Sequence, residues 1–101
     1  MAGGAVAGLM CEDGCYDLIQ GGEIVGRLIW VAEPSEARAR AGWWLIAPGV
    51  PDELIYRVPP DLLDDLLEAR RESVSMSLGL AEQILASRAE GPRRLMRRPL
   101  R

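Results

Sequence analysis

The chain has 101 residues, of which 49% are hydrophobic and 27% charged, and its formal net charge is −3. This length supports one hydrophobic core, and the balance of apolar and charged residues excludes a wholly disordered chain. The sequence contains no histidine, and all twelve of its basic residues are arginine. Without histidine and lysine the common nucleophile and base pairs of enzymes cannot be built, so we expect neither catalysis nor a cofactor.

The first thirteen residues contain no predicted element. They are small and apolar at first, but they lack the basic start of an export signal. No apolar stretch approaches the roughly 18 residues that span a bilayer. We therefore predict a flexible leader and acidic loop over 1–13, in a cytoplasmic protein without membrane contact.

Four segments that favour strands follow, separated by turn-forming glycine and proline. They are residues 15–20, 24–32, 43–47 and 54–58. The turn "GGE" joins the first two as a hairpin. Pro59 and Pro60 then end the sheet, because proline donates no backbone hydrogen bond. The pattern predicts a small antiparallel sheet of about four strands.

A C-terminal helix is predicted over 61–90, where Asp61 can cap the first turn. Five apolar residues at helical spacing are expected to cover one face of the sheet. They are Leu63, Leu67, Val74, Leu78 and Leu85. The sequence thus predicts the α+β class, with a single domain over 14–90 and the helix packed on one face of the sheet.

Residues 73–78 permit a second interpretation, because three serines alternate there with three apolar residues as on a half-buried strand. The serines, the β-branched Val74 and Gly79 also lower helix propensity, by about 2–3 kcal/mol in total. Helical spacing nevertheless continues through them, so we favour a helix that is either continuous or broken near 73–79. A strand here, with the helix after it, would resemble the start of a ribbon-helix-helix repressor, although "PRRLMRRPLR" offers no second helix.

The charges are unevenly distributed. Residues 1–68 carry twelve acids against four arginines, whereas residues 69–101 carry three acids against eight arginines. We predict a basic, disordered tail over 91–101. Its arginines are candidate contacts for weak binding of nucleic acid, namely Arg93, Arg94, Arg97, Arg98 and Arg101.

Two cysteines, Cys11 and Cys15, flank an acidic loop. A structural zinc site needs four ligands, which two cysteines without histidine cannot supply. We expect no metal and interpret the pair as incidental thiols, with a redox or metal-binding protein as a further alternative.

The adjacent residues Trp43 and Trp44 must point to opposite faces of their strand. One can enter the core, while the other stays on the uncovered face, where it is a candidate for protein binding. Six residues form the predicted interface: Trp30, Trp43, Trp44, Arg27, Arg57 and Tyr56. Alternatively, the polar connections fold over this face. Because the sheet half of the chain is acidic, stacking of nucleic-acid bases is disfavoured.

The leading hypothesis is a small, non-catalytic protein-binding module of the adaptor or inhibitor type, which could form a homodimer. The arginine-rich, lysine-free composition is typical of GC-rich bacterial genomes and their mobile elements, so anti-CRISPR-like roles are included. The alternatives are a DNA-binding regulator or antitoxin that uses the basic C-terminal third, and the cysteine-based protein described above.

Overall fold

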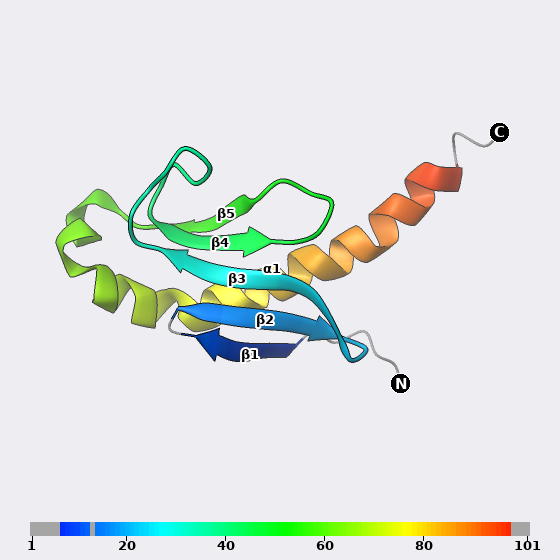
Figure 1. The fold of residues 1–101 in the computed structure, drawn as a ribbon, viewed down its shortest axis with the longest axis horizontal. Coiled ribbons are helices and arrows are strands. Elements are labelled where there is room, and N and C mark those ends of the chain that lie inside the picture. The colour runs from blue at the N-terminus through cyan, green and yellow to red at the C-terminus, as the bar shows by residue number, and fades with distance from the viewer. Residues whose placement is uncertain (1–6, 13, 98–101) are drawn as a thin grey trace.

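The computed structural model describes residues 7–12 and 14–97, and the side chains of residues 14–88. Five strands form one antiparallel sheet in which every strand pairs with its neighbours along the chain. The elements are β1 (Ala7–Glu12), β2 (Cys15–Gln20), β3 (Glu23–Val31), β4 (Gly42–Ile46), β5 (Glu53–Arg57), the 3-10 helix η1 (Pro60–Asp65) and α1 (Leu66–Arg97). The predicted α+β class, with an antiparallel sheet and one C-terminal helix, is confirmed (Figure 1).

Two boundaries differ from the prediction. Residues 7–12, placed in the leader from the sequence, form the edge strand β1 against β2. The segment "AGLMCE" contains no β-branched and no aromatic residue, so it gave no strand signal. At the other end α1 continues to Arg97, through the first seven residues of the predicted tail.

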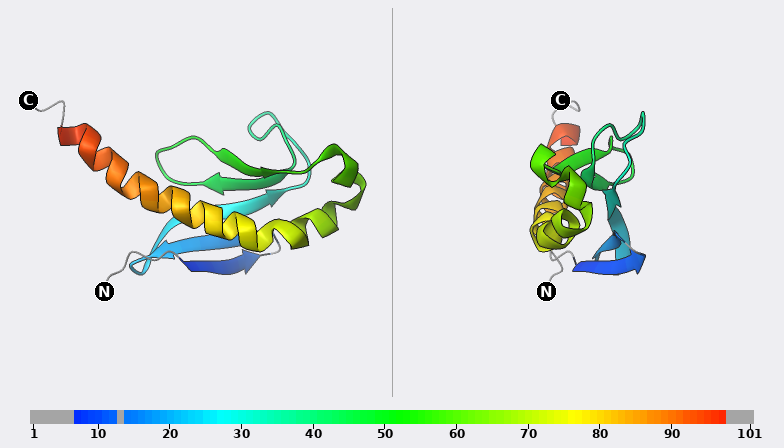
Figure 2. Two further views of the ribbon diagram at one scale, coloured as in Figure 1. Left: turned by 180° about the vertical axis from the view of Figure 1, so that it is seen from behind. Right: turned by 90° about the vertical axis from the view of Figure 1, so that its left-hand side faces the viewer.

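Residues 73–79 belong to one continuous helix, which crosses the strands on one side of the sheet only (Figure 2). Val74, Leu78 and Ile84 of α1 are half-buried and pack against the core. The fully buried residues of the helix recur every fourth position and are mostly small. They are Ala69, Ser73, Ser77, Ala81 and Leu85. Two of the three serines that count against a helix on propensity, Ser73 and Ser77, are therefore the side chains that let α1 approach the sheet closely.

The prediction that Leu63 and Leu67 cover the sheet is wrong. Their exposed fractions are 51% and 69%. The predicted stripe assumed a single α-helix from residue 61, but residues 60–65 form a 3-10 helix, which has a different number of residues per turn. That change accounts for Leu63, which lies in η1. Leu67 lies within α1, where the buried residues recur every fourth position, so the buried face turns by about 40° at each step and does not include Leu67 at the start of the helix.

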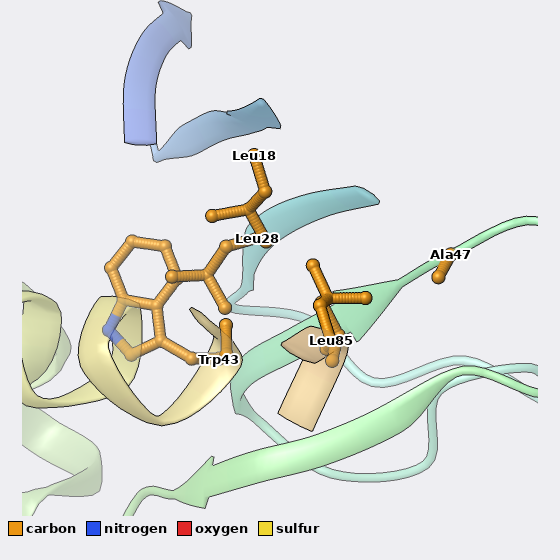
Figure 3. Packing of buried hydrophobic residues seen from close by; sticks show 7 residues of the cluster. Leu18, Leu28, Trp43, Ala47 and Leu85 are labelled. Atoms are coloured by element: carbon orange, nitrogen blue, oxygen red, sulfur yellow. The ribbon is translucent and has the colours of Figure 1, made fainter. Parts of the chain in front are cut away.

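Trp43 occupies the centre of the core, with 1% of its surface exposed (Figure 3). Its ring lies 5.3 Å from that of Trp30 and 5.8 Å from that of Tyr16, measured between centroids. The indole Nε1 donates a hydrogen bond of 2.8 Å to Ser73 Oγ, and that hydroxyl donates in turn to the carbonyl of Ala69 at 2.6 Å. The buried indole is thus satisfied by a helix residue, which joins α1 to β4.

Ser73 and Ser77 form a matched pair for testing this contact. Ser73→Ala leaves the buried Trp43 N–H without an acceptor and should lower the free energy of unfolding by about 1–3 kcal/mol. Ser77 Oγ is buried without a hydrogen-bond partner among the described residues, so Ser77→Ala should be neutral or stabilising. Urea denaturation of both variants measures the difference. Equal losses in the two variants would contradict the assigned role of Ser73.

Gly42 allows β4 and β5 to meet. Its φ is +147°, and a Cβ built on it would lie 1.8 Å from the carbonyl oxygen of Tyr56. Neither the backbone conformation nor the space admits a side chain. The end of the β4–β5 ladder therefore requires glycine.

Gly42→Ala should destabilise the domain by about 1–3 kcal/mol or more, because the added methyl group overlaps backbone atoms. Gly79→Ala is the control: it lies within α1, and a Cβ there meets nothing within 4 Å. That substitution should stabilise by about 0.5–1 kcal/mol. Thermal unfolding of the two variants should therefore shift in opposite directions.

Candidate functional site

The sheet has one face away from α1, which we call the open face (Figure 2, right). Trp43 is in the core, so Trp44 points to the other side, and its cross-strand partners Ile29 and Leu54 share that side. The pairing register extends the face to other strands. Its described residues are Cys15, Asp17, Ile19, Ile24, Arg27, Ile29, Val31, Trp44, Ile46, Leu54 and Arg57.

Aliphatic side chains dominate the open face. Ile24 is 57% exposed, while Ile29, Ile46 and Leu54 are half-buried. A shallow hollow of about 350 Å³ lies over β3 and β4, with Ile24 and Ile46 in its lining. Covering such a surface with a partner lowers the free energy, because apolar area is removed from water.

One ion pair lies among these aliphatic residues. Arg27 Nε donates to Asp17 Oδ1 at 3.0 Å, and 51% of the Arg27 side chain is exposed. An exposed pair of this type contributes only about 0–1 kcal/mol to stability. The ion pair does, however, present a partner with two oriented charges beside an apolar surface.

The connection between β3 and β4, residues 32–41, covers Trp44, and we call this connection the roof of Trp44. Only 9% of Trp44 is exposed, and its Nε1 donates to the carbonyl of Arg40 at 2.9 Å. Arg38 Nη2 reaches Asp52 Oδ2 at 2.9 Å, which ties this connection to the loop between β4 and β5. The polar connection has therefore folded over part of the open face, and Trp44 presents little surface to a partner.

The structure separates the six predicted interface residues. Arg27, Arg57 and Trp44 lie on the open face, whereas Trp30, Trp43 and Tyr56 pack in the core on the helix side. The assignment of Trp43 to an interface is wrong, because the helix buries it. Pairing in the sheet places Trp30 and Tyr56 directly opposite Trp43, so they share its side.

The side chains of the basic tail lie outside the part of the chain that the structure describes. Positions 93, 94 and 97 lie in α1, but their side chains are outside the described residues, as are positions 98 and 101 altogether.

Cys15 is disulfide-bonded, and Cys11 is the only other cysteine of the chain. The expectation of an incidental thiol at Cys15 is therefore wrong. Among the residues that the structure describes, no three His, Cys, Asp or Glu side chains are placed to hold a metal ion.

Sequence reasoning did not find Ile24 and Ile46 as surface residues. Their alternation with core residues carries that signal, since Ile46 follows the buried Leu45 on β4. The hydrogen bond from Trp44 Nε1 to the Arg40 carbonyl could not be predicted from sequence, because it depends on how residues 32–41 fold back.

Loss of the Arg38–Asp52 contact should loosen the roof over Trp44. In Asp52→Asn we expect faster hydrogen exchange of the Trp44 indole N–H, measured by NMR, while the Trp43 indole N–H stays protected by Ser73. Asp64→Asn, at an exposed aspartate for which no ion pair is found among the described residues, is the control. Unchanged exchange at Trp44 would show that the roof is held by other contacts.

Across residues 7–12 and 14–97, no helix has both the length and the apolar character to cross a membrane. No protein-family model, curated protein or solved structure matches this chain.

Proposed function

We propose that this chain is a non-catalytic protein-binding module of the adaptor or inhibitor type, and that the open face contacts the partner. The observation that carries the proposal is the aliphatic surface around Ile24 and Ile46, which no element of the described chain covers. An exposed isoleucine beside a hollow is a natural anchor position for a partner side chain. The Arg27–Asp17 pair would orient that partner through complementary charges.

A protein fits this surface better than a nucleic acid does. Binding of single strands on a sheet relies on exposed aromatic rings that stack with bases, in a basic surround. Here Trp44 is roofed, and Arg27 is already paired with Asp17. The open face therefore lacks an exposed aromatic ring for base stacking, and of its two arginines one is neutralised by an ion pair.

The second candidate is nucleic-acid binding by the end of α1. It is favoured by one observation: the helix continues to Arg97, so positions 93, 94 and 97 follow helical spacing within about 100° of one another. Arginines on one side of a helix can contact phosphates. Such binding would weaken steeply with salt, unlike binding through an aliphatic face.

A cytoplasmic location was expected because residues 1–13 lack an export signal, but the disulfide at Cys15 argues against it. Disulfides persist mainly in oxidising compartments. Binding through the open face does not depend on the compartment.

Ile24→Asp should weaken partner binding, because a carboxylate in an apolar contact loses its hydration and the neighbouring Arg27 is already paired with Asp17. Leu67→Asp is the matched control, since Leu67 is also an exposed aliphatic residue, 69% against 57%, but lies on α1. The partner is first captured from the source cells with the wild-type chain. Affinities of the three purified chains for that partner are then measured by calorimetry.

We expect a loss of about tenfold or more for Ile24→Asp and little change for Leu67→Asp. Equal affinity of all three chains would reject the open face. If light scattering shows that Ile24→Asp converts a dimer into a monomer, the partner is a second copy. Binding of DNA or RNA that disappears with salt would instead favour the second candidate.

A further inference from the structure

A cavity of about 470 Å³ lies at the end of the sheet where β5 leads into η1. Two segments that are distant in sequence form it, residues 32–41 and residues 57–63. Its lining is apolar except for two arginines: Ala32, Pro34, Arg40, Ala41, Arg57, Val58, Pro60 and Leu63. Half of the Leu63 surface, 51%, is exposed, so a ligand in the cavity would cover it.

The backbone of both arginines is held in place. The carbonyl of Arg40 accepts the hydrogen bond from Trp44 Nε1, and Arg57 pairs with Gly42 at the end of the ladder. Between them, Val58 N donates to the carbonyl of Ala41 at 3.1 Å and closes the floor of the cavity. A site whose backbone is already fixed loses less entropy when it binds a ligand.

Both arginines lack an acidic partner among the described residues, whereas Arg27, Arg38 and Arg88 each have one. The surroundings do not lack acids, since Glu33 and Asp61 are sequence neighbours of lining residues. Neither carboxylate belongs to the lining or pairs with Arg40 or Arg57. The cavity thus combines two available cations with an apolar floor.

We propose that this cavity binds the C-terminal residue of the protein partner, with the α-carboxylate on Arg40 and Arg57 and an apolar side chain against Val58 and Leu63. Arginine is the residue best suited to carboxylate recognition, because its planar donors match the two oxygens. In a terminal residue the carboxylate and the side chain share one Cα, so both fit a single compact cavity. Capture of a C-terminal carboxylate is an established mode of peptide recognition.

This inference rests on the proposed function only in taking the ligand to be part of a protein, and its test needs no partner. The probes are N-acetyl-leucine and N-acetyl-leucinamide, which differ in the carboxylate alone. NMR titration of the full chain follows the methyl groups of Ala41, Val58 and Leu63. The acid should bind about tenfold more tightly than the amide, because it adds charge-assisted hydrogen bonds.

Arg40→Gln combined with Arg57→Gln should remove the preference for the acid, and higher salt should reduce it in the wild type. Arg71→Gln is the control, because Arg71 is exposed on α1 and does not line the cavity. Thermal unfolding checks that each variant folds. Equal binding of acid and amide, or a preference that survives the double substitution, would overturn the proposal.

Ile24→Asp separates this inference from the proposed function, because it alters the open face and leaves the cavity lining unchanged. It should retain the preference for the acid. If the preference is absent while Ile24→Asp still weakens partner binding, the open face stands and the C-terminal site fails. If the preference is present while Ile24→Asp has no effect on partner binding, the C-terminal site stands and the open face fails.

Discussion

The hydrogen bond from Trp43 to Ser73 is the contact on which the arrangement of helix and sheet depends. Trp43 and Ser73 are 1% and 2% exposed, so neither polar group can turn to water for a substitute. A buried N–H without an acceptor costs about 1–3 kcal/mol, a large fraction of the stability of a domain this small. A larger residue at position 73 would hold the helix away from the indole. The serine therefore provides both the acceptor and the space.

Because α1 covers one side only, the two faces of the sheet have different chemistry. The helix side has the aromatic residues and the buried leucines, whereas the open face has aliphatic residues, one ion pair and a roofed tryptophan. The same roofing connection that closes over Trp44 also fixes the backbone of Arg40 beside Arg57. Residues 32–41 thus remove an aromatic surface from the open face and create a cationic cavity at its end.

The sequence predicted the features that depend on local pattern. Alternation along a strand placed Trp43 and Trp44 on opposite faces, and helical spacing favoured a helix through residues 73–78; both are confirmed. It failed where the outcome depends on non-local contacts. β1 is stabilised by pairing with β2 rather than by its own strand propensity. The exposure of Leu67 follows from the path of the sheet contact along α1, whose buried residues recur every fourth position, so that the buried face turns round the helix.

The candidate site was predictable to a similar degree. Arg27 and Arg57 were correctly placed on the uncovered side by alternation, but the burial of Trp44 required knowledge of how a polar connection of ten residues folds back. Neither periodicity nor propensity describes such a connection. The cavity around Arg40 could not be foreseen for the same reason.

Small side chains recur every fourth residue on α1, so the contacts at the centre of the helix do not by themselves fix its position along its axis relative to the sheet. A shift of four residues, about 6 Å, would present Ser77 to Trp43 with the same hydroxyl group. The ends of the contact distinguish the two alignments. In the observed one Leu85 lies over Gly26, where a Cβ would be 3.1 Å from the leucine, and Arg88 pairs with Glu53. After the shift Ala89 would replace Leu85 and Pro92 would replace Arg88, so the filled space and the ion pair would both be lost. The hydrogen bond between Trp43 and Ser73 thus helps to hold the helix on the sheet, and the contacts of Leu85 and Arg88 fix its position along its axis.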